Sequence, residues 1–274
     1  MKKILAGAAF LCSLTGVGYA QPISASFLDQ YNNSFDYSDL ISRAVDNPEV
    51  GGYFYAHKVL SECKMASSLF DFWKEKSKKS ANAARDSALN LISARCVNIP
   101  AERLSDDYLS KLYVEGTSGR DPLFVASKSY SNSMPALKSG NVSQARRSEA
   151  ISAALQVKDP LVVQDLGLRL VVNKDPDSGR TTFRAHGQDI PLNSKVDVGL
   201  ATFLVPCEMG LNCDAKDFAV TLPCASQGIC DINRHEAVKR MAVESGKDYE
   251  GITKLAKLIA DSLKDQSKSA PALD

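Results

Sequence analysis

The sequence predicts an all-α protein, an irregular and solenoid-like stack of antiparallel helix pairs stapled by disulfides, with one small β-hairpin near residues 170–190. Three observations lead to this prediction. A short cysteine-containing unit occurs twice, apolar residues recur at spacings of three and four over much of the chain, and this spacing fails in a single segment.

The repeated unit reads Pro-Cys, five residues, then Cys-Asp, and its two copies begin at Pro206 and Pro223. Within each copy a glycine, Gly210 or Gly228, lies between the cysteines. A glycine at this position is typical of a helix end and a chain reversal, and the aspartate after the second cysteine is typical of the N-cap of the next helix. The duplication therefore predicts stacked helices.

The first residues resemble an export signal. Lys2 and Lys3 precede an apolar run over 4–17, and the small-residue site Gly18-Tyr19-Ala20 follows it, as in a Sec-type signal peptide. The run is shorter than the roughly 20 residues that span a bilayer, and no later segment qualifies; a retained anchor is the alternative. We expect a signal peptide over 1–20, a flexible leader over 21–33, and a periplasmic or secreted mature protein.

Charge excludes two classes of partner. Removing residues 1–20 takes two lysines from the 33 Lys+Arg and none of the 32 Asp+Glu, so the mature chain has 31 against 32 and a formal charge of −1. Neither a nucleic-acid binder nor a binder of anionic membranes is indicated. Cys12 leaves with the signal, so six of the seven cysteines remain, an even number that predicts disulfides in an exported protein.

Geometry predicts the first disulfide. Cys63 belongs to a helical stripe whose members are Tyr53, Ala56, Leu60, Cys63, Ser67 and Phe70. Leu89, Ile92 and Cys96 share a face of the next helix, and the polar stretch 76–80 between the two helices is the expected turn. An antiparallel hairpin folded at this turn places both cysteines at the same height, where their Cα atoms can approach the roughly 5.5 Å of a disulfide. The sequence therefore predicts Cys63–Cys96.

The other four cysteines leave two pairings open. Cys207 with Cys213 and Cys224 with Cys230 would clip each helix end to its own loop, whereas pairing between the two copies would lock neighbouring helices together. We favour the local clips, because two nearly identical units most simply carry identical bridges. Zinc is the competing interpretation, but five intervening residues exceed the two to four usual in zinc fingers, so we expect neither metal nor cofactor.

One helical domain is expected over 34–265, followed by a disordered tail over 266–274. Within it, helices are predicted over 37–45, 50–76, 81–96, 105–115, 143–157 and 236–243, in a cysteine-rich part over 191–245, and along an amphipathic last helix with Ile252, Leu255, Ile259 and Leu263. The hairpin is predicted from the extended stretches 170–172 and 181–183 around a turn at 175–179.

A short motif that occurs twice predicts two further helix starts. Asp121-Pro122 and Asp159-Pro160 lie 38 residues apart, each followed by apolar residues. Aspartate as N-cap with proline at the first helical position explains both copies. The separation is within the range of a helix-pair repeat.

Two resemblances follow from these motifs. The cysteine segments 207–213 and 224–231, with Tyr53-Phe54-Tyr55-Ala56 ahead of Cys63, resemble a group of uncharacterised exported proteins of Gram-negative bacteria over most of the mature chain. The helix pairs and closely spaced cysteines are also similar to the cysteine-rich Sel1-like repeat proteins, exported α-solenoids implicated in protein binding. The cysteine spacing here is shorter, and the glycine- and alanine-rich repeat signature is not sustained. These resemblances imply an architecture and no activity.

No catalytic site is recognisable in the sequence. The three histidines, His57, His186 and His235, are isolated, and the stretch Arg234-His235-Glu236-Ala237 lacks the second histidine of a zincin helix. An enzyme alternative is a peptidoglycan-directed hydrolase that uses Glu49 or Glu62.

The best indication of function is a surplus of aromatic residues on one helix. Tyr53, Phe54, Tyr55, Phe72 and Trp73 occupy more than one of its faces. A helix that is apolar on more than one face can bury the second face in a partner. We therefore expect a binding or assembly protein with a protein partner in the cell envelope; an inhibitor or immunity-type protein is a further alternative.

Overall fold

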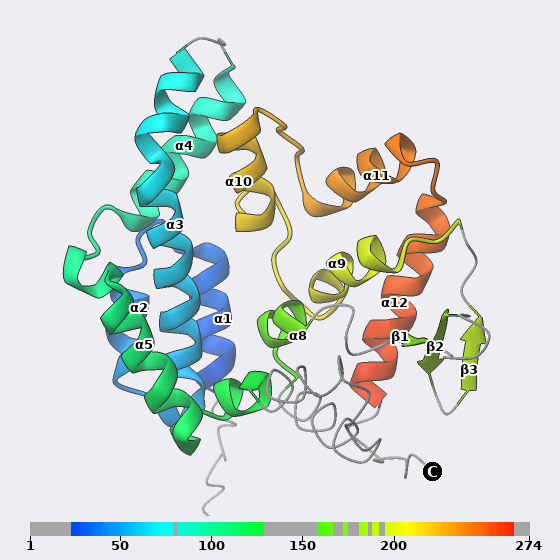
Figure 1. Ribbon diagram of the computed structural model, residues 1–274, viewed down its shortest axis with the longest axis horizontal. Coiled ribbons are helices and arrows are strands. Elements are labelled where there is room, and N and C mark those ends of the chain that lie inside the picture. The colour runs from blue at the N-terminus through cyan, green and yellow to red at the C-terminus, as the bar shows by residue number, and fades with distance from the viewer. Residues whose placement is uncertain are drawn as a thin grey trace, which may run out of the picture.

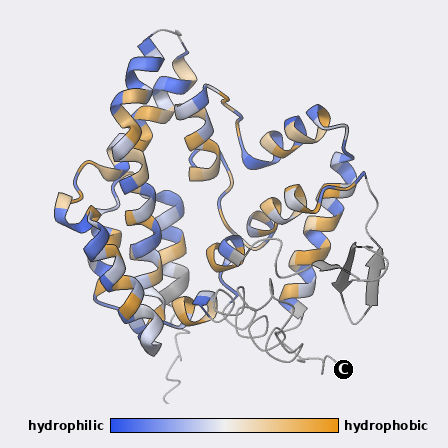
Figure 2. Ribbon diagram, in the orientation of Figure 1, coloured by the Kyte–Doolittle hydropathy of each residue, from blue (hydrophilic) through white to orange (hydrophobic). Residues whose placement is uncertain are grey.

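The computed structural model describes residues 23–78, 82–128, 158–166, 172–174, 181–185, 188–191 and 195–265, and this part of the chain is mostly helical (Figure 1). The first group of elements surrounds the long helix α3 (Gly52–Lys78). It comprises α1 (Ile23–Asn33), α2 (Ser38–Val45), η1 (Pro48–Val50), α4 (Ala83–Cys96), η2 (Ala101–Leu104), α5 (Asp106–Glu115), η3 (Gly116–Arg120) and a helical stretch over 122–128. The second group comprises α8 (Pro160–Leu166), α9 (Val198–Glu208), α10 (Phe218–Gln227), α11 (Arg234–Glu244) and α12 (Tyr249–Asp265). Most helices carry both hydrophobic and hydrophilic residues along their length (Figure 2).

The helices predicted over 37–45, 50–76, 81–96 and 105–115 are confirmed to within two residues at each end. Side-chain caps account for two of the starts. The Asn82 side chain accepts hydrogen bonds from the backbone amides of Ala84 and Arg85, and the Ser105 hydroxyl accepts one from Tyr108. Each cap satisfies amides that have no partner within the helix.

The predicted leader over 21–33 is wrong where the structure describes it. Residues 23–33 form helix α1, and its Phe27 and Tyr31, four residues apart, are buried against the core. The Phe27 ring lies 5.8 Å from the Tyr55 ring of α3. Burying two aromatic rings on one face offsets the entropy lost when the segment is ordered. The predicted signal peptide at 1–20, helix at 143–157 and tail at 266–274 lie outside the described residues.

The segment in which a hairpin is predicted contains short strands. β1 (Val172–Lys174), β2 (Thr181–Ala185) and β3 (Gln188–Pro191) form an antiparallel sheet in the order β1-β2-β3. Val172 and Ile190 both pair with Phe183, so β2 is the central strand. Figure 1 shows this sheet at the edge of the molecule, beside α12.

Both Asp-Pro starts are confirmed, and both caps also anchor the start of α3. One oxygen of Asp121 accepts from the amides of Leu123 and Phe124, and the corresponding oxygen of Asp159 accepts from those of Leu161 and Val162. Their second oxygens accept from consecutive residues of α3, at 2.8 Å from the Phe54 amide to Asp121 and at 2.6 Å from the Tyr55 hydroxyl to Asp159. The two Asp-Pro motifs therefore both dock on α3.

The three disulfides have the favoured connectivity. Cys63 bonds Cys96 with the Cα atoms 5.5 Å apart, and the two repeated units are each closed locally, as Cys207–Cys213 and Cys224–Cys230.

In both repeated units the glycine has a positive φ, 106° at Gly210 and 77° at Gly228, as a chain reversal after a helix requires. The predicted N-caps are displaced along the chain. Asp217 caps α10 and Asn233 caps α11, because Asp214 closes the intervening turn onto the Lys216 amide and Asp231 binds Arg240.

The core is divided into two clusters. The larger one lies among α1, α2, the first half of α3, α5, α8, α9 and α12. The smaller one lies under the α3–α4 hairpin, where Ala66 and Trp73 pack with Leu89, Ile92 and the Cys224–Cys230 unit of α10. Arg85 of α4 donates to the carbonyl oxygens of Ala225 and Ser226 and so satisfies acceptors at the end of α10.

Replacing Cys63 and Cys96 together by serine should lower the free energy of unfolding by about 3 to 4 kcal/mol, because the disulfide constrains a long loop in the unfolded chain. Urea unfolding of the oxidised protein measures this loss. The double serine variant of Cys207 and Cys213 is the matched control; its bridge spans six residues, so a smaller loss of about 2 kcal/mol is expected. Equal losses in both variants would contradict the loop argument.

Candidate functional site

Four of the five aromatic residues predicted to bind a partner are buried within this chain, so that prediction is wrong for them. Tyr53, Phe54, Tyr55 and Trp73 are each at most 8% exposed. The first three lie where the two aspartate caps dock on α3, and Trp73 fills the smaller core cluster. Only Phe72, which is 65% exposed, is available on the surface.

Phe72 belongs to an exposed row on the distal half of α3. Met65, Leu69 and Phe72 follow at intervals of four and three residues and therefore lie on one side of the helix; they are 39%, 41% and 65% exposed. We call these three residues the apolar stripe. Sequence reasoning missed Met65 and Leu69, because the buried stripe through Cys63 accounted for the helical spacing.

Neighbouring helices explain why the stripe is uncovered. Helix α5 runs antiparallel to α3, since Tyr53 bonds Glu115 at one end and Lys64 pairs with Asp106 at the other. Asp106 is the first residue of α5, so α3 extends past it toward the tip of the α3–α4 hairpin, which stands at the top of Figure 1. The exposed lysines Lys74, Lys76 and Lys78 follow the stripe toward this tip.

A groove of about 220 Å³ lies between α3 and α4, beside the Cys63–Cys96 disulfide. Its apolar lining includes Ala66, Phe70 and Ile92, and among the residues that the structure describes Asp71 is the one charged member of the lining. This lining has no nucleophile paired with a base, so it offers a place for an apolar side chain rather than for acid–base chemistry.

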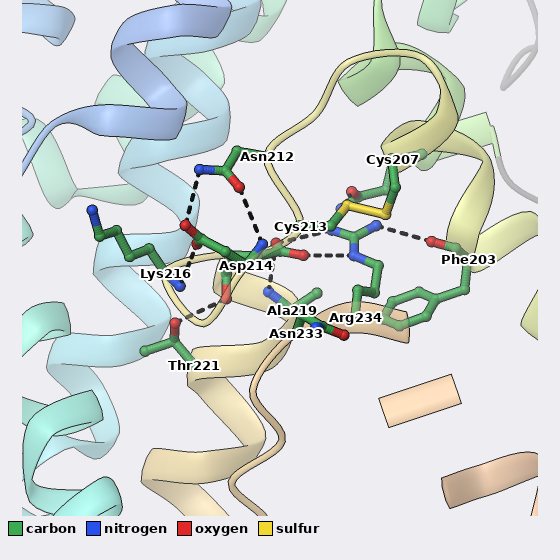
Figure 3. A network of polar contacts seen from close by, with 12 residues as sticks. Phe203, Cys207, Asn212, Cys213, Asp214, Lys216, Ala219, Thr221, Asn233 and Arg234 are labelled. Carbon is green, nitrogen blue, oxygen red and sulfur yellow. Dashed lines mark hydrogen bonds and ion pairs between the residues drawn. A yellow bond between two sulfur atoms is a disulfide. The ribbon is translucent and has the colours of Figure 1, made fainter. Parts of the chain in front are cut away.

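Arg234 is the centre of a buried polar network (Figure 3). Its guanidinium donates to both carboxylate oxygens of Asp217, at 2.5 and 2.9 Å, and to the Phe203 carbonyl at 3.0 Å. It also donates to the Gln164 side chain at 3.1 Å and lies over the Phe203 ring. The Arg234 backbone amide donates to the carbonyl of Cys213, at 2.8 Å. One side chain thus connects α8, α9, α10 and α11 next to the Cys207–Cys213 disulfide.

Sequence reasoning considered Arg234 only as part of a rejected zinc motif. A signal was present, because Arg234 is the first residue of α11, where the helix dipole favours an acidic residue. A cation at that position indicates a specific anionic partner, which the structure identifies as Asp217.

A second buried polar cluster is centred on Glu62, one of the two glutamates considered for hydrolysis. The Tyr31 hydroxyl donates to the Glu62 carboxylate at 2.9 and 3.2 Å, and the Lys58 ammonium lies 3.7 Å from it. Burial raises the pKa of Glu62 to about 7, although Lys58 and the Tyr31 hydrogen bond oppose this shift. A strongly shifted carboxyl in a charged cluster is a candidate functional group.

The positions of the two glutamates do not favour hydrolysis. A general acid must reach the leaving group of its substrate, and Glu62 is 7% exposed and enclosed by Tyr31 and Lys58. Glu49 is exposed on the short turn η1.

Removing the Arg234 guanidinium should unfold the network. Arg234→Met leaves the Asp217 carboxylate buried without its cation, and we expect a loss of about 3 to 5 kcal/mol in the free energy of unfolding. Denaturant unfolding measures it. The matched control is Arg240→Met, which breaks the more exposed pairs with Asp231 and Glu244 and should cost at most about 1 kcal/mol. Similar losses for the two variants would contradict the central place of Arg234.

The buried carboxyl of Glu62 should make stability depend on pH. Because its pKa is raised from 4.5 to about 7 on folding, the folded state binds the proton more tightly; the stabilisation is complete below the unfolded pKa and is lost as the pH rises through the folded one. Relative to the parent, Glu62→Gln should therefore gain up to about 3 kcal/mol between about pH 5 and pH 8. Urea unfolding of both proteins across this range measures the difference, and a constant difference would contradict the shift.

Within the described part of the chain, no group of three or more histidine, cysteine, aspartate or glutamate residues is placed to hold a metal ion. The same residues include no helix with the length and apolar character needed to cross a membrane. His57 is part-buried against the Phe124 ring, which lies 5.3 Å away, and burial lowers its pKa; His186 lies outside the described residues. The chain matches no known family model, no curated protein and no solved structure.

Proposed function

We propose that this chain is an exported, disulfide-stabilised binding protein whose apolar stripe docks an acidic, amphipathic segment of a protein partner in the cell envelope. The observation that carries the proposal is the exposure of Met65, Leu69 and Phe72 in one row on α3. Contiguous exposed apolar residues on a protein surface mark interaction sites more often than scattered ones do. Large aromatic residues such as Phe72 supply much of the apolar area that an interface buries.

The export part of the proposal rests on two independent features. Residues 1–20 have the pattern of a signal peptide, and the structure has three disulfides, which persist in oxidising compartments outside the cytoplasm. In this proposal the helix pairs serve as a rigid scaffold, as in the solenoid-like proteins that the sequence resembles.

Rigidity of the hairpin supports the docking role. Cys63–Cys96 joins α3 to α4 just before the stripe begins, and Trp73, which follows Leu69 of the stripe by four residues, packs in the smaller core cluster. A surface that is already ordered loses less conformational entropy when it binds. The stripe is therefore presented in a fixed geometry.

Charge indicates the chemistry of the partner. Lys76 follows Phe72 by four residues and continues the row of the stripe, with Lys74 and Lys78 on either side of it in the sequence. Between residues 74 and 78 three lysines face one acid, Glu75, while the mature chain as a whole carries almost no net charge. An amphipathic segment with acidic residues beyond its apolar face would match both the stripe and the lysines.

The test is a crosslinking pull-down from the native envelope with the oxidised mature protein, read by mass spectrometry. We expect one protein, crosslinked to α3 through an acidic amphipathic segment, and at least a tenfold lower recovery with Phe72→Ser, because truncating an interface anchor typically costs 2 kcal/mol or more. Phe35→Ser is the matched control, since Phe35 is 58% exposed but lies outside α3. Recovery that does not depend on Phe72, or recovery of glycan alone, would overturn the proposal.

A further inference from the structure

Lys58 lies between two carboxylates from different helices. Its ammonium nitrogen is 3.2 Å from Asp165 of α8 and 3.7 Å from Glu62 of α3. Glu62 and Lys58 are largely withdrawn from water, with 9% and 18% of their side chains exposed, whereas Asp165 is exposed at 36%. Screening by solvent is therefore weaker for these charges than for pairs on the surface.

The charged groups around this cluster leave Lys58 as the cation that Glu62 and Asp165 share. Several titratable and charged groups act on the cluster from the surrounding elements: Tyr31 of α1, Tyr37 before α2, His57 of α3, Asp159 before α8, Asp165 of α8, Asp217 before α10 and Arg234 of α11. Arg234 is committed to Asp217 by two hydrogen bonds, and Asp159 is bonded by Tyr55 and by its own helix. Glu62 and Asp165 are left to share one lysine.

Helix α8 depends on such contacts because it is short. It has seven residues, and its polar anchors are Asp159 to Tyr55, Asp165 to Lys58 and Gln164 to Arg234. The first two anchors hold it to α3, and the third holds it to the network of the cysteine-rich part. A change in the Lys58–Asp165 pair therefore alters how α8 is held between the two groups of helices.

We propose that Glu62, Lys58 and Asp165 form a proton-operated clasp, in which ionisation of Glu62 draws Lys58 away from Asp165 and loosens α8 from α3. With Glu62 protonated, Lys58 is free to pair with Asp165, while Arg234 pairs with Asp217 and Asp159 is held by Tyr55 and the amides of α8. With Glu62 ionised, one more negative charge faces the same two bases, and Glu62 and Asp165 compete for Lys58. Burial raises the pKa of Glu62 to about 7, so the clasp responds near neutral pH, while the lowered pKa of His57 keeps that side chain neutral there. This inference is independent of the docking function proposed for the stripe.

Hydrogen exchange of the α8 amides in the full mature protein tests the clasp. After correction for the intrinsic pH dependence of exchange, protection of α8 should fall by up to about fivefold between about pH 6 and pH 8, the effect of losing one part-exposed ion pair. Glu62→Gln, which stays neutral, should keep α8 protected at both pH values. Asp165→Asn should leave α8 weakly protected at both. Glu49→Gln, a change to an exposed glutamate, should behave like the parent.

Carbon-13 NMR of the side-chain carboxyls in the unmodified protein keeps the test independent of variant folding. The Glu62 signal should titrate near neutral pH, and the Asp165 signal should shift at the same midpoint as it gains or loses Lys58. The proposal would be overturned if Glu62 titrated at the usual pKa of a glutamate, or if the Asp165 signal did not change when Glu62 titrates. It would also be overturned if α8 protection were equal at both pH values.

Discussion

The buried guanidinium of Arg234 is the constraint on which the cysteine-rich part of the structure depends. A cation removed from water needs acceptors for its donors, and Arg234 finds four of them in the two oxygens of Asp217, the Phe203 carbonyl and Gln164. These acceptors come from α8, α9 and the start of α10, so the helices must arrive together for the cation to be satisfied. The Cys207–Cys213 bridge stiffens the turn beside the network, because the Cys213 carbonyl accepts the Arg234 amide. Satisfied networks of this kind favour one arrangement of helices over its alternatives.

Helix α3 plays the corresponding part in the first half of the chain. Its consecutive residues Phe54 and Tyr55 receive the two aspartate caps, which lie 38 residues apart in the sequence. Because both caps dock at its start, the first half of α3 is covered by other segments, and the larger core cluster forms there. The distal half then extends beyond α5 and keeps one apolar row exposed, so the anchoring of one end of the helix explains the exposure of the other.

Two polar clusters meet at α8 through consecutive residues. Gln164 reaches Arg234, and its neighbour Asp165 reaches Lys58. The second contact is coupled to a group that titrates near neutral pH, because burial raises the pKa of Glu62 to about 7 and Glu62 shares Lys58 with Asp165. In the proposed clasp, the contact of α8 through Lys58 is the one that varies with pH. Glu62 also precedes Met65 by three residues, so the variable contact lies one helical turn from the apolar stripe.

The sequence by itself determined the features that depend on near neighbours. Capping residues, apolar spacing and the position of a turn specify α2 to α5, and the pairing of Cys63 with Cys96 follows because a hairpin brings together residues equidistant from its turn. The two Asp-Pro starts and both local cysteine clips belong to the same class. Of the residues that the sequence suggested for partner binding, only Phe72 is exposed.

Only the tertiary structure decided which faces are covered. Local patterns do not encode which distant segment packs on a given helix. The sequence therefore left Tyr53, Phe54 and Tyr55 available for a partner, whereas the fold buries all three, with the Asp121 and Asp159 caps bonded to Phe54 and Tyr55. The same reason explains why the segment that resembled a polar leader is helix α1, whose Phe27 and Tyr31 are buried in the folded core. Burial also raises the pKa of Glu62 and makes Arg234 depend on its partners, because the free energy of a charge depends on the surroundings that the whole fold provides.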